Sequence, residues 1–235
     1  MLTFIEKSDL KFEVKKVIES AINDSKARDI HKRVIDPFGA LFDAHINKNT
    51  SSKWLEKETS RQNQKSLQQS VGDMHENIIS KLKGGWEKFD GILDVKNDKM
   101  KIVAEIKNKY NTTKGNHQKN IYDDLLSIIE TDGYKNHTGY YVVIIPKKPL
   151  PFNIPFTPSD NKTRLNRPEN NKIRQIDGRS FYALATGVQS ALMDLYQELP
   201  RVIEEVFKDL SISYISDLDK DNFFNLLMKK AYGDD

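Results

Sequence analysis

The sequence of 235 residues contains no cysteine. Disulfides, thiolate zinc ligands and cysteine nucleophiles are therefore excluded, and this composition suits the reducing cytoplasm, where we expect the protein. Long apolar runs are also missing, because the longest, residues 140–145, is far too short to span a bilayer. The N-terminal start carries Glu6 and Lys7 and lacks the apolar core of a signal peptide.

Motifs of several common enzymes are absent as well. The chain has no G-x-x-x-x-G-K-[ST], G-x-G-x-x-G, H-E-x-x-H or G-x-S-x-G sequence. Its five histidines are scattered, so without cysteine they form no metal-ligand spacing. Carboxylates combined with a hard cation remain as the chemistry to look for.

The small net charge of +3 hides two basic segments. Residues 96–120 hold seven lysines against two acidic residues, and residues 146–176 hold seven Lys or Arg against two, so each segment is +5. The rest of the chain is therefore −7 (3 − 10), and residues 203–235 alone are −4 (four lysines, eight acids). This pattern indicates a polyanion-binding surface, although solvated loops would give the same count.

Hydrophobic spacing places helices towards both ends of the chain and strands in the middle. We expect helices over residues 10–22, 66–82, 117–130 and 180–195, with Ser180 as an N-cap and Pro200 opening a further helix. We expect strands over residues 86–95, 99–107 and 139–145, the last buried on both faces. The pattern predicts an α/β fold with a mixed central sheet of about five strands, flanked by helices and preceded by an N-terminal helical region.

The sharpest feature is Phe89-Asp90-Gly91 followed by Glu105-Ile106-Lys107. We place the hairpin turn at Asn97-Asp98, so that Asp90 faces Glu105 at roughly 5 Å between β-carbons and Lys107 points to the same face. Two such carboxylates repel each other unless a hard divalent cation lies between them. A neighbouring ammonium can orient or help deprotonate an attacking water. Two carboxylates, a divalent cation and an ammonium are together the groups that phosphodiester hydrolysis uses. The alternative is the charged outer face of an ordinary hairpin.

Asp94 is the rival of Asp90. In the same register it faces Lys101 and lies roughly 13 Å from Asp90, too far to share a cation with Glu105. The choice depends on the register, because a slip of one residue spoils the pairing.

These residues resemble the PD-(D/E)xK nuclease superfamily, with Phe89 in place of the proline that often precedes the aspartate. The order of helix, motif hairpin, helix and buried strand also resembles the core of that superfamily. More narrowly, the chain resembles type II restriction endonucleases that cut GGNCC-type sites, over about half of its length. The stretches that carry this resemblance are Ser70–Glu76, Phe89–Gly91, Glu105–Thr112 and Asp177–Gly187.

The resemblance implies Mg²⁺ as the cofactor, with Asp90, Glu105 and the backbone carbonyl of Ile106 as its ligands and Lys107 serving the attacking water. It also suggests a further carboxylate from the preceding helix, for which Glu76 is the candidate. The helical position of Glu76, on the side away from the apolar stripe, favours a solvated residue instead. We expect His75 to be structural or exposed.

Residues 146–176 form the candidate DNA-recognition loop. They hold six of the eight prolines, and about thirty residues without a clear element are typical of a functional loop, although residues 174–176 can start a short strand. Arginine binds guanine bidentately, so the arginine content suits a G/C-rich site. The alternative is an unstructured basic loop that holds phosphates without reading bases. The candidate DNA contacts of the whole chain are Lys109, Lys114, Gln118, Lys119, Lys162, Arg164, Arg167, Lys172 and Arg174.

Gln118 and Tyr122 match the Q-x-x-x-Y box of exonuclease-type members of the superfamily, although we expect Tyr122 to be a packing residue. An exonuclease or repair nuclease is therefore the second hypothesis. A DNA-binding protein without catalytic activity is the third.

Our leading interpretation is a single nuclease domain over residues 1–235. It comprises an N-terminal helical part (1–85), a catalytic core (86–145), the recognition loop (146–176) and C-terminal helices (177–235). We expect Mg²⁺-dependent cleavage of double-stranded DNA at a short palindrome to leave 5′-phosphates, by a homodimer, without a membrane. A cognate DNA methyltransferase is expected as a genetic partner. The recognised bases and the cleavage position are left open by the sequence.

Overall fold

The computed structural model describes residues 2–27, 34–113, 116–214 and 222–233, and these divide into two units. The larger unit consists of Met1–Val14 and Met74–Asp235, and the smaller one of Lys15–Asp73. All residues of the candidate active site belong to the larger unit. No helix of the described residues is long and apolar enough to cross a membrane.

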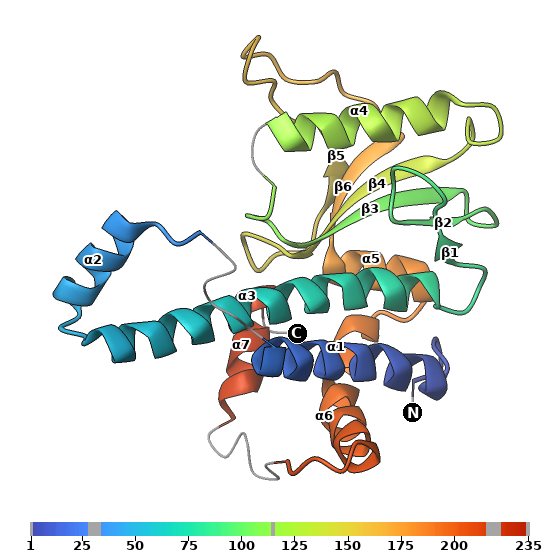
Figure 1. The fold of residues 1–235 in the computed structure, drawn as a ribbon. Coiled ribbons are helices and arrows are strands. Elements are labelled where there is room, and N and C mark those ends of the chain that lie inside the picture. Colours follow the sequence, from blue (N-terminus) through green and yellow to red (C-terminus); the bar gives the residue numbers. More distant parts are fainter. Residues whose placement is uncertain (1, 28–33, 114–115, 215–221, 234–235) are drawn as a thin grey trace. The chain divides into compact units, whose positions relative to one another are not determined.

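A six-stranded mixed sheet forms the centre of the larger unit, in the order β1-β2-β3-β4-β6-β5 (Figure 1). The strands are β1 Glu87–Lys88, β2 Val95–Asn97, β3 Ile102–Lys109, β4 Thr138–Ile145, β5 Asn153–Pro155 and β6 Ile173–Asp177. β3, β4 and β6 run parallel, whereas β1, β2 and β5 are joined by antiparallel pairing. This confirms the expected α/β class and a mixed sheet of about the expected size.

Helices of the larger unit lie on both faces of this sheet. The helices of the described residues are α1 Lys7–Ala27, α2 Pro37–Ile46, α3 Ser51–Ser80, α4 Asn116–Glu130, α5 Gly178–Thr186, α6 Ala191–Asp209 and α7 Phe223–Tyr232. α4 lies on one face and α5 on the other (Figure 1). The apolar spacing of α4 explains this, because Ile121, Leu125 and Ile129 form one buried stripe against the strands.

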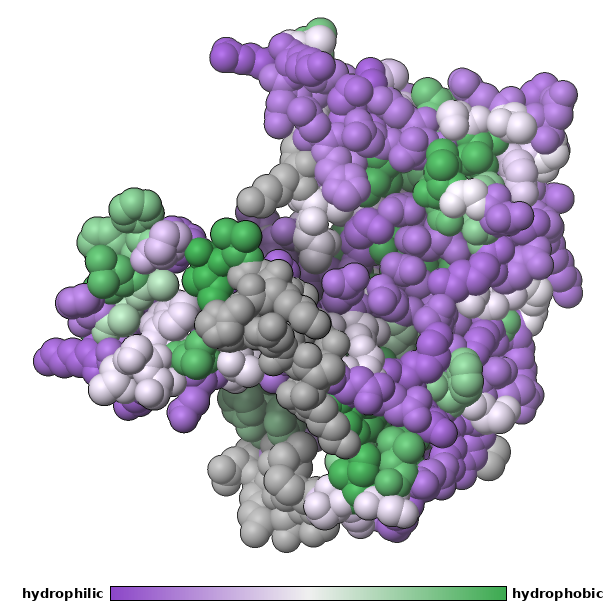
Figure 2. All heavy atoms as spheres, in the orientation of Figure 1, coloured by the Kyte–Doolittle hydropathy of each residue, from purple (hydrophilic) through white to green (hydrophobic). Residues whose placement is uncertain are grey.

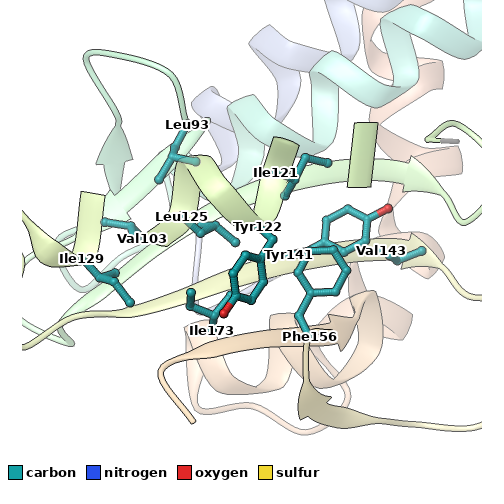
Figure 3. Close-up of a cluster of buried hydrophobic side chains, with 10 residues drawn as sticks. All are labelled: Leu93, Val103, Ile121, Tyr122, Leu125, Ile129, Tyr141, Val143, Phe156 and Ile173. Carbon is teal, nitrogen blue, oxygen red and sulfur yellow. The ribbon is translucent and has the colours of Figure 1, made fainter. Parts of the chain in front are cut away.

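The core on the α4 side is built from β3, β4 and residues that follow β5. Tyr141 and Val143 of β4 pack there with Tyr122 of α4 and with Phe156 (Figure 3). Phe156 contacts both tyrosines, with ring centroids 4.8 Å from Tyr141 and 6.2 Å from Tyr122. β4 is buried along almost its whole length, as expected for a central strand.

The register of the motif hairpin differs from our expectation. Val95 faces Ala104, whereas a turn at Asn97-Asp98 would have placed Met100 there. The chain uses a longer connection, because the buried Asn97 side chain accepts a hydrogen bond from the Met100 backbone N–H at 2.9 Å. The strand therefore resumes only at Ile102, and the predicted pairing of Asp90 with Glu105 is wrong.

The predicted cap at Ser180 is also wrong. Asp177 caps α5, since its side chain accepts hydrogen bonds from the backbone N–H of Ser180 at 3.0 Å and of Phe152 at 2.6 Å. α5 ends at Gly187, whose φ of +73° is the left-handed conformation that terminates helices. Pro200 lies inside α6 and opens no new helix.

The smaller unit contains α2 and parts of α1 and α3. Asp36 caps α2 ahead of Pro37, and the helix buries none of its own residues. In α3, Glu58 is nearly buried and accepts hydrogen bonds from Arg61 and Gln62. None of these groups belongs to the site described next.

Candidate active site

The motif hairpin brings Asp94, Glu105 and Lys107 together. The Lys107 Nζ lies 2.5 Å from a Glu105 carboxylate oxygen and 3.8 Å from Asp94 Oδ2. The same Asp94 oxygen accepts a hydrogen bond from the Ile106 backbone N–H at 2.6 Å, which fixes the carboxylate against β3. The three charged groups are mostly buried, with side chains between 12% and 22% exposed.

The electrostatics of this cluster show an excess of negative charge. Burial, followed by the charge of Asp94, raises the pKa of Glu105 to about 7, and the attraction of Lys107 only partly opposes this. Burial lowers the pKa of Lys107, but the charges of Glu105 and Asp94 outweigh burial and the net shift is upward. Lys107 is therefore protonated at neutral pH. Its single positive charge does not balance two ionised carboxylates, so the cluster has an excess of negative charge.

Asp90 lies elsewhere. It is exposed and belongs to a bend between β1 and β2, next to Gly91. The Phe89 backbone N–H donates to the Asp94 carbonyl at 3.1 Å, so the bend closes over the residues in between. The sequence signal that separates the two acids is local, because glycine directly after Asp90 marks a turn whereas Asp94 stands between the apolar Leu93 and Val95.

Glu76, near the end of α3, is closer to the cluster than its helical position suggested. Its side chain is only 24% exposed, and its Oε2 lies 3.8 Å from Lys88 Nζ. Its charge also helps to raise the pKa of Lys107. Glu76 is thus a partly buried neighbour of the lysine.

The donor set fits a hard divalent cation. Within the described part of the chain, no group of three or more His, Asp or Glu side chains could hold a metal by itself. Mg²⁺ does not need such a cage, because it is usually bound by one or two carboxylates together with water and phosphate oxygens. The adjacent carboxylates of Asp94 and Glu105, with their uncompensated charge, meet that requirement.

Three residues near the cluster share a hydrogen-bond chain, of which only Gln118 was predicted. Tyr141 of β4 faces Glu105 in the parallel β3–β4 register, and its hydroxyl lies 2.6 Å from Thr113 Oγ1. Gln118 donates to the same Thr113 oxygen at 3.4 Å. The tyrosine comes from a strand 36 residues later in the chain (141 − 105), and no local pattern announces this pairing.

Two expectations about neighbouring residues are confirmed. Tyr122 is buried in the α4 core, and its hydroxyl donates to the Pro168 carbonyl at 2.8 Å, so it is a packing residue. His75 is structural, with its Nδ1 lying 2.9 Å from the Tyr182 hydroxyl and its pKa lowered to about 4 by burial.

The candidate DNA contacts fall into two groups. Several are already engaged inside the protein: Lys119 and Arg167 both pair with Asp123, Lys172 donates to the Lys135 carbonyl, and Arg174 binds Asn153. Lys162 and Arg164 are exposed, Lys109 is half-buried on β3, and Lys114 lies outside the described residues. Residues 146–176 are more ordered than expected, because they contain β5, most of β6 and an isolated bridge between Ser159 and Asn166.

The mixed sheet flanked by helices has the architecture of a restriction-endonuclease-like core. The sequence model of the Eco47II restriction endonuclease family matches residues 2–208, and the chain belongs to this family of type II restriction endonucleases. The type II restriction enzyme Eco47II of Escherichia coli is 37% identical over 240 residues, which cover 99% of each chain. The type II restriction enzyme Sau96I of Staphylococcus aureus is 32% identical over 215 residues, covering 87% of this chain and 80% of the relative.

Membership in this family confirms the expected resemblance and the expected activity, a site-specific endodeoxyribonuclease acting on double-stranded DNA. It favours this interpretation over an exonuclease, a repair nuclease or a DNA-binding protein without activity.

Proposed function

We propose that the chain hydrolyses both strands of a short palindromic GGNCC-type site in a Mg²⁺-dependent reaction, with Asp94, Glu105 and Lys107 as catalytic residues. Asp94 takes the role that we first expected of Asp90. The observation that carries this proposal is the geometry of the hairpin, in which two carboxylates and one lysine meet at 2.5 and 3.8 Å. This arrangement has the parts of a PD-(D/E)xK active site.

Asp94, Glu105 and the backbone carbonyl of Ile106 would hold Mg²⁺, and Glu76, whose charge acts on Lys107, is the candidate for a further carboxylate. When bound, Mg²⁺ would supply a Lewis acid that lowers the pKa of a water and neutralises charge on the phosphate. Lys107 acts as a protonated donor, because its raised pKa makes it a poor base at neutral pH. It would orient the attacking water and balance negative charge at the scissile phosphate.

We further propose that the enzyme acts as a homodimer, because a two-fold symmetric site requires two active sites related by the same symmetry. A cognate methyltransferase would protect the host DNA, and the expected location is the cytoplasm. Lys109, Lys114, Lys119 and Lys172 would hold phosphates of the DNA, and their charge would strengthen binding to any DNA sequence.

Cleavage of closed circular plasmid DNA containing GGNCC sites tests the function. Wild type with Mg²⁺ should yield discrete bands ending in 5′-phosphates, whereas Glu105→Ala and Lys107→Ala should lower the rate by about 10²- to 10³-fold or more, the scale of one lost electrostatic group. Digestion that begins at DNA ends and spares closed circles would favour an exonuclease. Full activity in both variants would disprove the active-site assignment.

A further inference from the structure

Residues 156–168 form a short loop outside the sheet, which we call the excursion. Backbone hydrogen bonds join its two ends. Ser159 and Asn166 form an antiparallel bridge, and the Arg167 backbone N–H donates to the Pro158 carbonyl at 2.8 Å. Phe156, the first residue of the excursion, is buried against Tyr122 (Figure 3). We call residues 159–166 the tip hairpin.

The turn of the tip hairpin is closed by Asp160. Its backbone N–H donates to the Leu165 carbonyl at 2.8 Å, and its carbonyl accepts from the Arg164 N–H at 2.7 Å. Its carboxylate accepts from the backbone N–H groups of Lys162 at 2.8 Å and Thr163 at 3.4 Å. The turn is therefore ordered by its own hydrogen bonds, which an unstructured phosphate-binding loop would not be.

Two residues of α4 hold the segment that directly follows the tip hairpin, at its base. Arg167 Nη2 lies 2.6 Å from Asp123 Oδ2, and the Tyr122 hydroxyl donates to the Pro168 carbonyl at 2.8 Å. Lys119 shares the same Asp123 oxygen at 3.0 Å. The guanidinium of Arg167 is thus neutralised by a carboxylate, and to bind a guanine it would first have to break this ion pair.

Arg164, at the turn of the tip hairpin, differs from Arg167 in having no carboxylate partner among the described residues. Its side chain is exposed and forms no hydrogen bond or ion pair with another described residue. Its φ of +59° lies in the left-handed region, which costs a residue other than glycine or asparagine about 1 kcal/mol. Strained backbone positions are common at ligand-binding sites, so an exposed arginine at such a position is a candidate contact. The surface in the upper part of Figure 2 is mostly hydrophilic with small apolar spots, and the tip hairpin itself exposes Leu165 beside Arg164.

We propose that Arg164 reads a guanine of the recognition site, and that Arg167 is a positioning residue that fixes the tip hairpin through Asp123. This inference rests on the proposed DNA recognition. Arginine reads guanine through the bidentate contact to O6 and N7 in the major groove. Asp123 keeps the base of the hairpin on α4, and so holds Arg164 at a fixed distance from the core.

Equilibrium binding to short duplexes tests both roles, with Ca²⁺ in place of Mg²⁺ and at constant salt. The probes are a duplex containing GGACC, one containing GGGCC, and a scrambled duplex of equal composition. The readout is the ratio of the dissociation constants for scrambled and GGNCC DNA, because removing a charge changes the affinity for all DNA alike. Wild type should discriminate; equal affinity for all three would disprove the proposed recognition site itself.

Arg164→Gly is the sharpest variant, since glycine removes the side chain and relieves the backbone. The ratio should fall about 10- to 100-fold, the size of one bidentate pair, while the thermal midpoint is unchanged or higher. Full discrimination in this variant, with a discriminating wild type, would overturn the role of Arg164 alone.

Arg167→Ala and Asp123→Ala should lower the ratio in the same direction, and the double variant should be no worse than the worse single variant. The charge-swapped pair Arg167→Asp with Asp123→Arg should recover part of the loss. Lys109→Ala is the matched control, because it removes a proposed phosphate contact outside this ion pair, and so should weaken binding to every duplex and leave the ratio unchanged. If Asp123→Ala raised the ratio while Arg167→Ala lowered it, Arg167 would be a base contact and the positioning role would be wrong.

Discussion

The carboxylates of Asp94 and Glu105 share one ammonium, that of Lys107, and the charge of Asp94 helps burial to raise the pKa of Glu105 to about 7. In the unfolded chain the pKa of Glu105 is near 4.5, so the folded state binds this proton more tightly. The stability that the proton confers is complete below pH 4.5 and is lost as the pH rises towards 7. The cluster is therefore a source of instability in the metal-free protein above about pH 7.

Glu105→Gln should therefore stabilise the metal-free protein at pH 8, by on the order of 2 kcal/mol, while abolishing cleavage. Thermal unfolding in EDTA measures this. Lys107→Met is the matched control and should have the opposite effect, because it removes the cation between the two carboxylates. A Glu105→Gln protein less stable than wild type at pH 8 would contradict the charge imbalance described above.

Binding and removal of Mg²⁺ should change the thermal midpoint of the protein. Mg²⁺ should raise the thermal midpoint of wild type at pH 8, since a ligand that binds only the folded state stabilises it. The shift should be much smaller in Glu105→Gln, and EDTA should reverse it in wild type. An equal shift in both proteins would place the metal elsewhere.

The two candidate aspartates can be separated by a matched pair of substitutions. Asp94→Asn should reduce the cleavage rate by about 10²- to 10³-fold or more, because it removes a carboxylate held against Glu105. Asp90→Asn should stay within about threefold of wild type, because Asp90 is exposed in a bend and lies apart from the cluster. Single-turnover cleavage of plasmid DNA distinguishes them, and the reverse order of effects would restore Asp90 to the site.

His75 should make folding sensitive to mild acid. Burial lowers its pKa from 6.5 to about 4, so the unfolded chain binds more protons between these values. Stability should therefore fall by roughly 3 kcal/mol as the pH drops from 6.5 to 4. Urea unfolding across this range should show a shallower dependence in His75→Gln than in wild type. The exposed His117, changed to Gln, serves as the control and should leave the dependence intact.

Gly178 should tolerate no side chain. A β-carbon there would lie 2.5 Å from the Ile144 carbonyl oxygen, an immovable backbone atom of β4. Gly178→Ala should therefore cost about 2 kcal/mol or more in the free energy of unfolding, by forcing α5 away from the sheet. Ser180→Ala in the same helix should change stability by less than about 0.5 kcal/mol, because Asp177 is bonded by the backbone N–H and not by the serine hydroxyl.

Elements with a strong local period could be predicted from the sequence, and pairings that depend on loop geometry could not. The stripe of Ile121, Leu125 and Ile129 defines α4, and the apolar run of β4 marks a buried strand. The register of the motif hairpin depends on how many residues its connection uses. That number is set by the buried Asn97 side chain, which no periodic pattern reveals.

The same distinction holds for the candidate site: residues that share one strand could be predicted, and contacts between distant segments could not. Glu105 and Lys107 follow from their spacing on one strand, because alternate residues share a face. A turn at Asn97-Asp98 would separate Asp94 from Glu105, whereas the observed register brings the two residues together. The contacts of Tyr141 with the site and of Arg167 with Asp123 join residues 36 and 44 positions apart, and such pairings arise only when the strands and α4 come together.

The bridge between Ser159 and Asn166 has a consequence for how this enzyme can change. It makes the tip hairpin a cassette, in which the residues displayed to solvent are separated from the bonds that hold its ends. Exchanging residues 161–165 would alter the side chains exposed at the turn. The contacts of Arg167 and Pro168 with α4, and the motif hairpin, would stay unchanged. Directed selection for new cleavage sites can therefore begin with libraries confined to these five positions.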